Sequence, residues 1–182
     1  MPFHQIKMED LLLRGVVSPE EANQPDFNDR TDLADKLWNM YNIDDHDMFI
    51  LISNPANNGV IVEFAKKIKE KGRKLIVVTS KAEAEASVSR HPSGKKLTDY
   101  ADLILDNCAP SPDMVVTLEN GQKINQVSTV TGNVIAQMLC AETYRYLTGL
   151  GHDCPVLLSA NVKGADVHNR EISDVYLGRW NS

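Results

Sequence analysis

The sequence lacks the features that mark nucleic-acid-binding and membrane proteins. Its 182 residues carry a formal net charge of -6, and the lysine-rich stretch 66–74 is typical of the solvated face of a helix rather than of a basic patch. Residues 1–10 contain no apolar signal-peptide core. The apolar stretch 11–17 is interrupted by Arg14 and Gly15 and is too short to span a bilayer. We therefore expect no nucleic-acid partner and no membrane insertion.

Cysteine and nucleotide-binding motifs are also scarce. The three cysteines, Cys108, Cys140 and Cys154, are odd in number, and no two of them have Cys-x-x-Cys spacing. This usage predicts reduced thiols in a cytoplasmic protein and no metal site. The absence of Gly-x-Gly-x-x-Gly and of Gly-Lys-Ser/Thr argues against a dinucleotide or a nucleoside triphosphate. We expect no cofactor.

What is present is the composition of one ordinary globular domain, with 42% hydrophobic and 24% charged residues. Residues 1–30 are rich in turn formers and predict no clear element. We therefore divide the chain into an N-terminal segment of unclear structure, residues 1–30, and a domain formed by residues 31–182.

The clearest unit is a strand, a helix and a second strand. Residues 48–52 and 75–78 are continuous apolar runs, which is typical of parallel strands buried on both faces. A polar loop, 53–58, and an amphipathic helix ending at Gly72 lie between them, so the sequence predicts an α/β fold with a parallel sheet. Weaker patterns predict further helices at 32–41, 81–88, 130–147 and within 166–177, and strands at 103–105 and 114–118, the last followed by the tight-turn pair Asn120-Gly121.

Hydroxyl and amide side chains follow the first two strands and begin the long helix. Ligands of open parallel sheets bind beyond the carboxyl ends of the strands, and helix N-termini there attract phosphate. The same residue types are the preferred helix caps, so simple capping is the alternative. The candidates for ligand binding are Ser53, Asn54, Asn57, Asn58, Thr79, Ser80, Ser128 and Thr129.

Candidate acids and bases are few. His91 and His168 lie in loop-like stretches, and Glu142 lies within the long helix. A histidine exchanges a proton near neutral pH, although a lone loop histidine is often a surface or structural residue. Arg90, beside His91, suits a phosphate or a carboxylate.

Several short motifs in one order resemble a known family. They are Ile52-Ser53-Asn54, Val77 to Ser80, Ser87 to Leu97, Asp106 to Pro110, Ser128 to Gly132 and Ser159 to Val162. Together they resemble the sugar isomerase (SIS) domain, in the branch of phosphoheptose isomerases and other sugar-isomerase-like proteins. The likeness spans about residues 31–179.

The resemblance implies a flavodoxin-like parallel sheet with helices on both faces, in homodimers or homotetramers. It implies a small-molecule phosphosugar held by Ser53, Asn54, Asn57 and Asn58, by Thr79 and Ser80, and less closely by Ser128 and Thr129. Aldose–ketose isomerisation in such domains uses a Glu or His base. The resemblance therefore makes His91, Glu142 and His168 candidates for catalysis.

Two departures from the family pattern stand out. The family's Ser-Asn-Ser-Gly loop here has Pro55 and Ala56 in its last two places, and proline removes a hydroxyl and an N–H donor. The family's first strand and Gly-Ser-Gly loop are not evident in residues 1–30. Three outcomes are open: the sheet lacks this strand, residues 11–17 take its position, or another chain fills it. An unfilled strand edge favours an oligomer.

Three functions remain open on these observations. The chain is a phosphosugar isomerase, a non-catalytic phosphosugar sensor or regulatory subunit, or a degenerate relative with a structural role. Pro55 and the absence of the family's first strand weigh against the first, and the hydroxyl-rich strand ends support the second. We rank phosphosugar binding at the carboxyl edge of the sheet first, with aldose–ketose isomerisation open, because the first two functions share this site.

Overall fold

The computed structural model describes residues 4–180 and opens with short helical pieces. These are α1 (Glu9–Leu13), α2 (Pro19–Ala22), the 3-10 turn η1 (Phe27–Asp29) and α3 (Asp32–Asn39). Residues 11–17 do not fill a strand position, because the chain reverses after α1. The N–H groups of Val16 and Val17 both donate to the carbonyl of Leu11, with Gly15 at a φ of 69°. Leu11 and Val17 are buried in the core instead.

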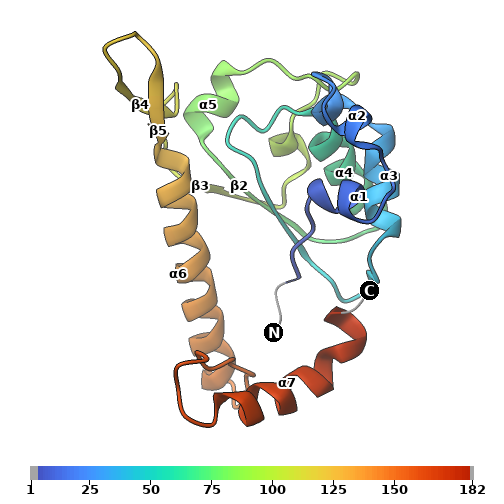
Figure 1. The fold of residues 1–182 in the computed structure, drawn as a ribbon, viewed down its shortest axis with the longest axis vertical. Coiled ribbons are helices and arrows are strands. Elements are labelled where there is room, and N and C mark those ends of the chain that lie inside the picture. The colour runs from blue at the N-terminus through green and yellow to red at the C-terminus, as the bar shows by residue number, and fades with distance from the viewer. Residues whose placement is uncertain (1–3, 181–182) are drawn as a thin grey trace.

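The predicted parallel sheet is confirmed. Strands β1 (Phe49–Ile52), β2 (Leu75–Thr79) and β3 (Leu103–Asp106) pair in the order β1-β2-β3, all parallel, with Phe49 opposite Leu75 and Ile76 opposite Leu103. Between them run α4 (Gly59–Glu70), α5 (Lys81–Ala86) and the 3-10 turn η2 (Leu97–Tyr100). Figure 1 shows α1 to α4 gathered on one side of this sheet. Among residues 4–180, β1 pairs with β2 alone, so its other edge is open.

The core lies between α4, α3 and the sheet. Ala65, Ile68, Leu75 and Val77 have no exposed surface, as the apolar face of an amphipathic helix packed on a buried strand requires. Three aromatic rings from different elements meet there, with Trp38 stacked at 5.5 Å on Phe49 and Phe64 beside both. Burying one such ring contributes about 2–3 kcal/mol, so this contact fixes α3 and α4 against β1.

The last third of the chain stands apart from this core. Strands β4 (Met114–Thr117) and β5 (Lys123–Gln126) form an antiparallel hairpin around the predicted Asn120-Gly121 turn. The long helix α6 (Val127–Gly149) follows, and then α7 (Ala165–Trp180). Figure 1 shows α6 running down one side of the molecule to α7 at the bottom. Within residues 4–180, no helix is long and apolar enough to cross a bilayer.

Candidate functional site

The carboxyl ends of the three parallel strands form one hydrogen-bonded polar cluster. The Asn54 side chain is at its centre, because its oxygen accepts from the Asn107 amide at 2.9 Å and its nitrogen donates to the Glu83 carboxylate. Thr79, at the end of β2, donates its hydroxyl to the Asn54 carbonyl at 2.8 Å. The parallel register brings these residues together, since it places the ends of β1, β2 and β3 at one edge of the sheet.

The hydroxyls of Thr79 and Ser80 are both fully buried. Ser80 accepts from the Glu83 N–H at 3.1 Å and donates to the Ala109 carbonyl at 2.6 Å, so it caps α5 and ties that helix to the chain after β3. In this structure Thr79 and Ser80 therefore make the capping and loop contacts that were the alternative to ligand binding. Their contribution is to hold the strand ends in place.

Other groups of the first loop keep free hydrogen-bonding capacity. Ser53 and Asn58 are half-buried, and neither side chain has a hydrogen-bond partner among residues 4–180. The Asn57 side chain donates to the Val88 carbonyl at 3.0 Å, while its oxygen is buried with no partner in the described part of the chain. Ala56 has a φ of 53°, a conformation that favours glycine. Alanine takes this conformation at the position where the resemblance places glycine.

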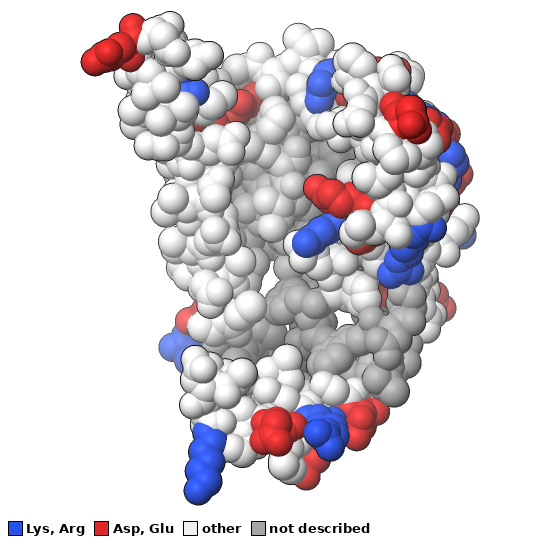
Figure 2. Space-filling model, in the orientation of Figure 1, with Lys and Arg blue, Asp and Glu red and all other residues white. Residues whose placement is uncertain are grey.

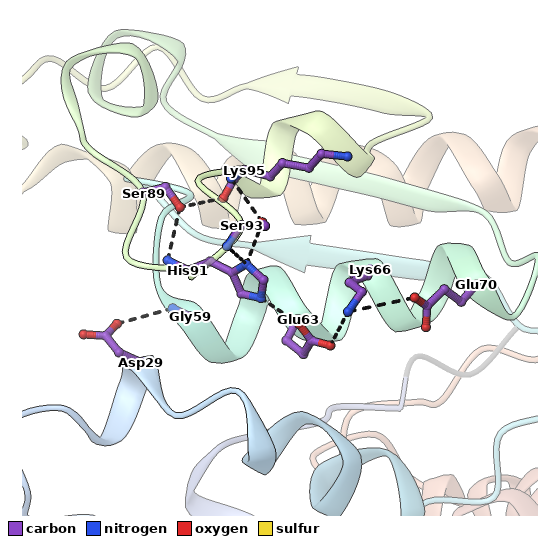
Figure 3. A network of polar contacts seen from close by, with 9 residues as sticks. All are labelled: Asp29, Gly59, Glu63, Lys66, Glu70, Ser89, His91, Ser93 and Lys95. Atoms are coloured by element: carbon purple, nitrogen blue, oxygen red, sulfur yellow. Dashed lines mark hydrogen bonds and ion pairs between the residues drawn. The ribbon is translucent and has the colours of Figure 1, made fainter.

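The first turn of α4 already carries a carboxylate of the protein. The N–H of Gly59 donates to the Asp29 carboxylate at 3.3 Å, and Arg90 contacts the same oxygen at 3.1 Å. Figure 3 shows Asp29 reaching up to Gly59 from the η1 turn. The Arg90 backbone N–H donates to the Asn57 carbonyl at 2.9 Å. Arg90 therefore lies beside the 53–58 loop, as a phosphate ligand would require, and its charge is shared with Asp29.

His91 belongs to a separate network between α4 and the 87–96 loop (Figure 3). The Ser93 backbone N–H donates to Nδ1 at 3.1 Å, so Nε2 carries the proton and donates to Glu63 at 2.6 Å. His91 as a whole residue is 7% exposed. Both ring nitrogens are thus occupied by the protein, and His91 positions the loop on α4.

Burial favours the neutral acid at Glu63, but hydrogen bonds from Lys66 and His91 outweigh it and lower the pKa of this carboxyl. A lowered native pKa contributes stability that is present above the unfolded value and is lost as the pH falls through the native value. We expect Glu63→Gln to cost about 1–2 kcal/mol at pH 7 and less at pH 4. Urea denaturation at both pH values measures this difference.

The control is Glu70→Gln, because Glu70 lies on the same helix but is largely exposed and reaches Lys66 only at 4.0 Å. It should follow the wild-type pH dependence. If Glu63→Gln loses stability equally at both pH values, the charge of Glu63 has no role in holding the loop.

The remaining sequence candidates lie elsewhere. Glu142 is on α6, paired with Arg145 at 2.6 Å, and His168 is on α7, where its Nε2 contacts the Val156 carbonyl at 2.9 Å. No hydrogen bond joins His91, Glu142 and His168 within residues 4–180. In Figure 1, α7 lies at the opposite end of the molecule from the loop after α5. The structure therefore does not gather the three into one site.

The long helix begins earlier than predicted, which changes the setting of Ser128 and Thr129. Asp113, 7% exposed, accepts from the N–H of Ser128 at 2.8 Å and from its hydroxyl, so the helix starts at Val127. This carboxylate, and neither the Ser128 nor the Thr129 hydroxyl, caps the first turn of the helix. Thr129 is exposed on the first turn.

Sequence reasoning missed Glu83, Asn107 and Asp29. Two of them had a usable signal. Asn107 directly follows the third strand, and Glu83 stands three residues after Ser80, in the spacing of a capping box. Glu83 turns to Asn54 instead of back to Ser80. Asp29 had no such signal, because its contact with Gly59 joins elements 30 residues apart.

Comparison with known proteins assigns the family. The sequence profile of the SIS domain matches residues 1–80. A UPF0309 protein of Halalkalibacterium halodurans is 35% identical over 163 residues, which is 88% of this chain and 67% of that protein. The chain belongs to the UPF0309 family of SIS-domain proteins. A UPF0309 protein of Caldanaerobacter subterraneus is 34% identical over 88% of this chain and 67% of its own length. A UPF0309 protein of Geobacillus thermodenitrificans is 32% identical over 98% of this chain and 71% of its own length.

The family likeness begins earlier in the chain than the motifs suggested. The SIS profile includes residues 1–30, where the sequence alone showed no resemblance. The N-terminal segment is thus part of the SIS-domain match. Its buried residues Leu11 and Phe27 belong to the same hydrophobic core as those of α4.

Proposed function

We propose that this UPF0309 chain is a cytoplasmic protein that binds a phosphorylated sugar at the carboxyl edge of its parallel sheet. The observation that carries the proposal is the polar cluster at the strand ends, flanked by hydrogen-bonding groups that have no partner among residues 4–180. These groups are the Ser53 hydroxyl and the Asn58 amide. A SIS domain is the fold on which such binding is expected, and free cysteines suit a reducing compartment.

The polar side chains at the carboxyl edge of the sheet suit a ligand with hydroxyls at one end and an anionic group at the other. Asn54, Asn58 and Glu83 offer amide and carboxylate groups to sugar hydroxyls. Arg90 uses its Nε on Asp29 and keeps its terminal nitrogens for an anion. Pro55 removes one backbone donor from the loop, so phosphate affinity relies more on Arg90 and less on the loop.

Aldose–ketose isomerisation is the second candidate function, and the Glu83 carboxylate favours it. A carboxylate held among the strand ends is placed to move a proton beside a sugar carbonyl. The expected bases His91, Glu142 and His168 lie in three separate settings. Glu83→Gln tests this function, because it should abolish turnover while the capping N–H of residue 83 remains.

The test is a thermal-shift scan against hexose, heptose and N-acetylhexosamine phosphates, with the parent sugars and inorganic phosphate as controls. A ligand at 100 times its Kd should add about 2.7 kcal/mol, a rise in Tm of roughly 5–10 °C. Ser53→Ala should leave the Tm of the free protein unchanged and reduce this rise, because its hydroxyl bonds to no described residue.

The outcomes separate the alternatives. A rise with a phosphosugar and not with its parent sugar, without turnover, supports a sensor or regulatory subunit. Turnover supports the isomerase. A protein that melts cooperatively and responds to none of these ligands overturns the proposal and leaves the structural role.

A further inference from the structure

The loop that carries His91 also places a serine hydroxyl against the imidazole ring. Ser93 Oγ lies 2.7 Å from Nδ1 of His91, and Nε2 of the same ring lies 2.6 Å from a carboxylate oxygen of Glu63. Figure 3 shows the imidazole between these two side chains. A hydroxyl, an imidazole and a carboxylate in a hydrogen-bonded series are the components of an activated nucleophile.

The protons of this series lie where activation of the hydroxyl requires them. The backbone N–H of Ser93 can only donate, so Nδ1 of His91 is an acceptor and carries no proton. The Ser93 hydroxyl therefore donates to Nδ1, while its oxygen accepts from the N–H of Lys95 at 3.2 Å. Nδ1 is thus placed to take the hydroxyl proton, and the Lys95 N–H stabilises the negative charge that develops on Oγ.

The base is held in place and the nucleophile is open to solvent. His91 is buried, whereas Ser93 is exposed. Lys66 donates to the other carboxylate oxygen of Glu63 at 2.8 Å, which fixes that carboxylate beside the ring. A carboxylate in this position orients the imidazole and stabilises the imidazolium that forms when the ring takes a proton. A substrate can therefore reach Ser93 while the base stays in its place.

The charges around this loop favour a neutral substrate. The cations of the loop are already engaged by the protein: Arg90 with Asp29, Lys95 with the Tyr100 ring and Lys96 with the Ala84 carbonyl. Figure 2 shows acidic and basic side chains mixed over the N-terminal helices α1 to α3 rather than gathered into a patch of one sign. Because only a field of one sign would draw an ionic substrate to the surface, these observations favour a small uncharged ester.

We propose that Ser93 is a nucleophile that hydrolyses small neutral carboxylic esters, with His91 as its base and Glu63 as the residue that positions the base. Oγ attacks the carbonyl carbon of the ester as its proton passes to Nδ1. The bond from that carbon to the leaving alcohol then breaks, and the alcohol takes the proton from Nδ1. Water repeats both steps on the acyl-serine and releases the carboxylic acid. The reaction uses none of the strand-end groups, so it is independent of the proposed phosphosugar site.

The test is reaction of the full chain with p-nitrophenyl acetate, which measures turnover, and with diisopropyl fluorophosphate, which locates the nucleophile. The second reagent forms an O–P bond to the serine and releases fluoride, and mass spectrometry of the peptides should find its phosphoryl group on Ser93. Ser93→Ala should abolish both reactions. His91→Gln should slow both by at least about 100-fold, because a positioned base contributes about 10²–10⁴-fold.

The matched control is Ser87→Ala, which should react like the wild type. The Ser87 hydroxyl lies in the same segment of the chain, but it donates to the Glu83 carbonyl at 2.7 Å instead of to His91. Labelling of the wild type at residues other than Ser93, or no labelling, would overturn the proposal, and neither result depends on the folding of a variant. So would a Ser93→Ala protein that hydrolyses the ester at the wild-type rate.

Glu63→Gln distinguishes positioning of the base from simple support of the loop. The amide oxygen can still accept from Nε2, so the nitrogen NMR spectrum of the His91 ring should report the same tautomer as in the wild type. Both reactions should nevertheless slow by at least about tenfold, because the charge that stabilises the imidazolium is lost. Equal rates for this variant and the wild type would overturn the role of Glu63.

Discussion

Replacing Gly59 with alanine should lower the free energy of unfolding by about 2–3 kcal/mol. A Cβ at Gly59 would lie 2.8 Å from the carbonyl carbon of Asp29 and 2.9 Å from its Cα, which are backbone atoms without rotamer freedom. Either α4 or the η1 turn must move, and both hold core residues, Val60 and Phe27. Thermal unfolding should show a drop in Tm of roughly 4–12 °C.

The matched control is Gly132→Ala on α6. No described atom lies within 4 Å of a Cβ built there, and alanine favours a helix interior over glycine by about 1 kcal/mol. This variant should be unchanged or slightly more stable, whereas Gly59→Ala should be less stable. An unchanged Tm for Gly59→Ala would mean that η1 does not pack against α4 in solution.

Much of the fold could be predicted because its elements are strongly patterned. The runs at 48–52 and 75–78 are apolar on both faces, and Gly72, at a φ of 71°, ends the helix between them as predicted. Residues 1–30 could not be predicted, because their short helices are fixed by tertiary contacts. Leu11 and Phe27 belong to the same core as α4, and no local periodicity reports that contact.

The candidate site was predictable in position more than in detail. Parallel strands require that Asn54 and Thr79 share one edge, and the structure joins them by a hydrogen bond. Which hydroxyls the protein uses for itself depends on distant partners. Ser80 bonds to Ala109, and Ser128 bonds to Asp113, which caps the start of the long helix. Those pairings are tertiary contacts, so the alternatives of capping and binding stayed open.

Asp29 has the most direct bearing on the proposed function. Its carboxylate accepts from the first N–H of α4 and pairs with Arg90, whose backbone N–H bonds to Asn57 in the 53–58 loop. A phosphate in that loop would share Arg90 with this carboxylate and be repelled by it. The protein therefore already holds a negative charge where the helix N-terminus favours one.

If the phosphate binds there, Asp29→Asn should raise the affinity for a phosphosugar by about tenfold. At an effective dielectric constant near 20, one charge pair a few ångströms apart is worth about 2–4 kcal/mol before salt screening, so the estimate is conservative. The amide oxygen still accepts from the Gly59 N–H, and only a half-exposed ion pair is lost, worth about 0–1 kcal/mol. Isothermal titration calorimetry of both proteins with the ligand chosen by the thermal-shift scan measures the change.

Asp26→Asn is the matched control, since Asp26 is exposed, lies three residues away, and makes no side-chain cap of η1. It removes the same charge from the same turn and should change the affinity by less than about twofold, because an exposed charge is screened by salt. Equal gains for the two variants would mean that net charge alone governs binding. A loss of affinity in Asp29→Asn would show that Asp29 orients Arg90 for the phosphate, and no change would place the phosphate away from the α4 N-terminus.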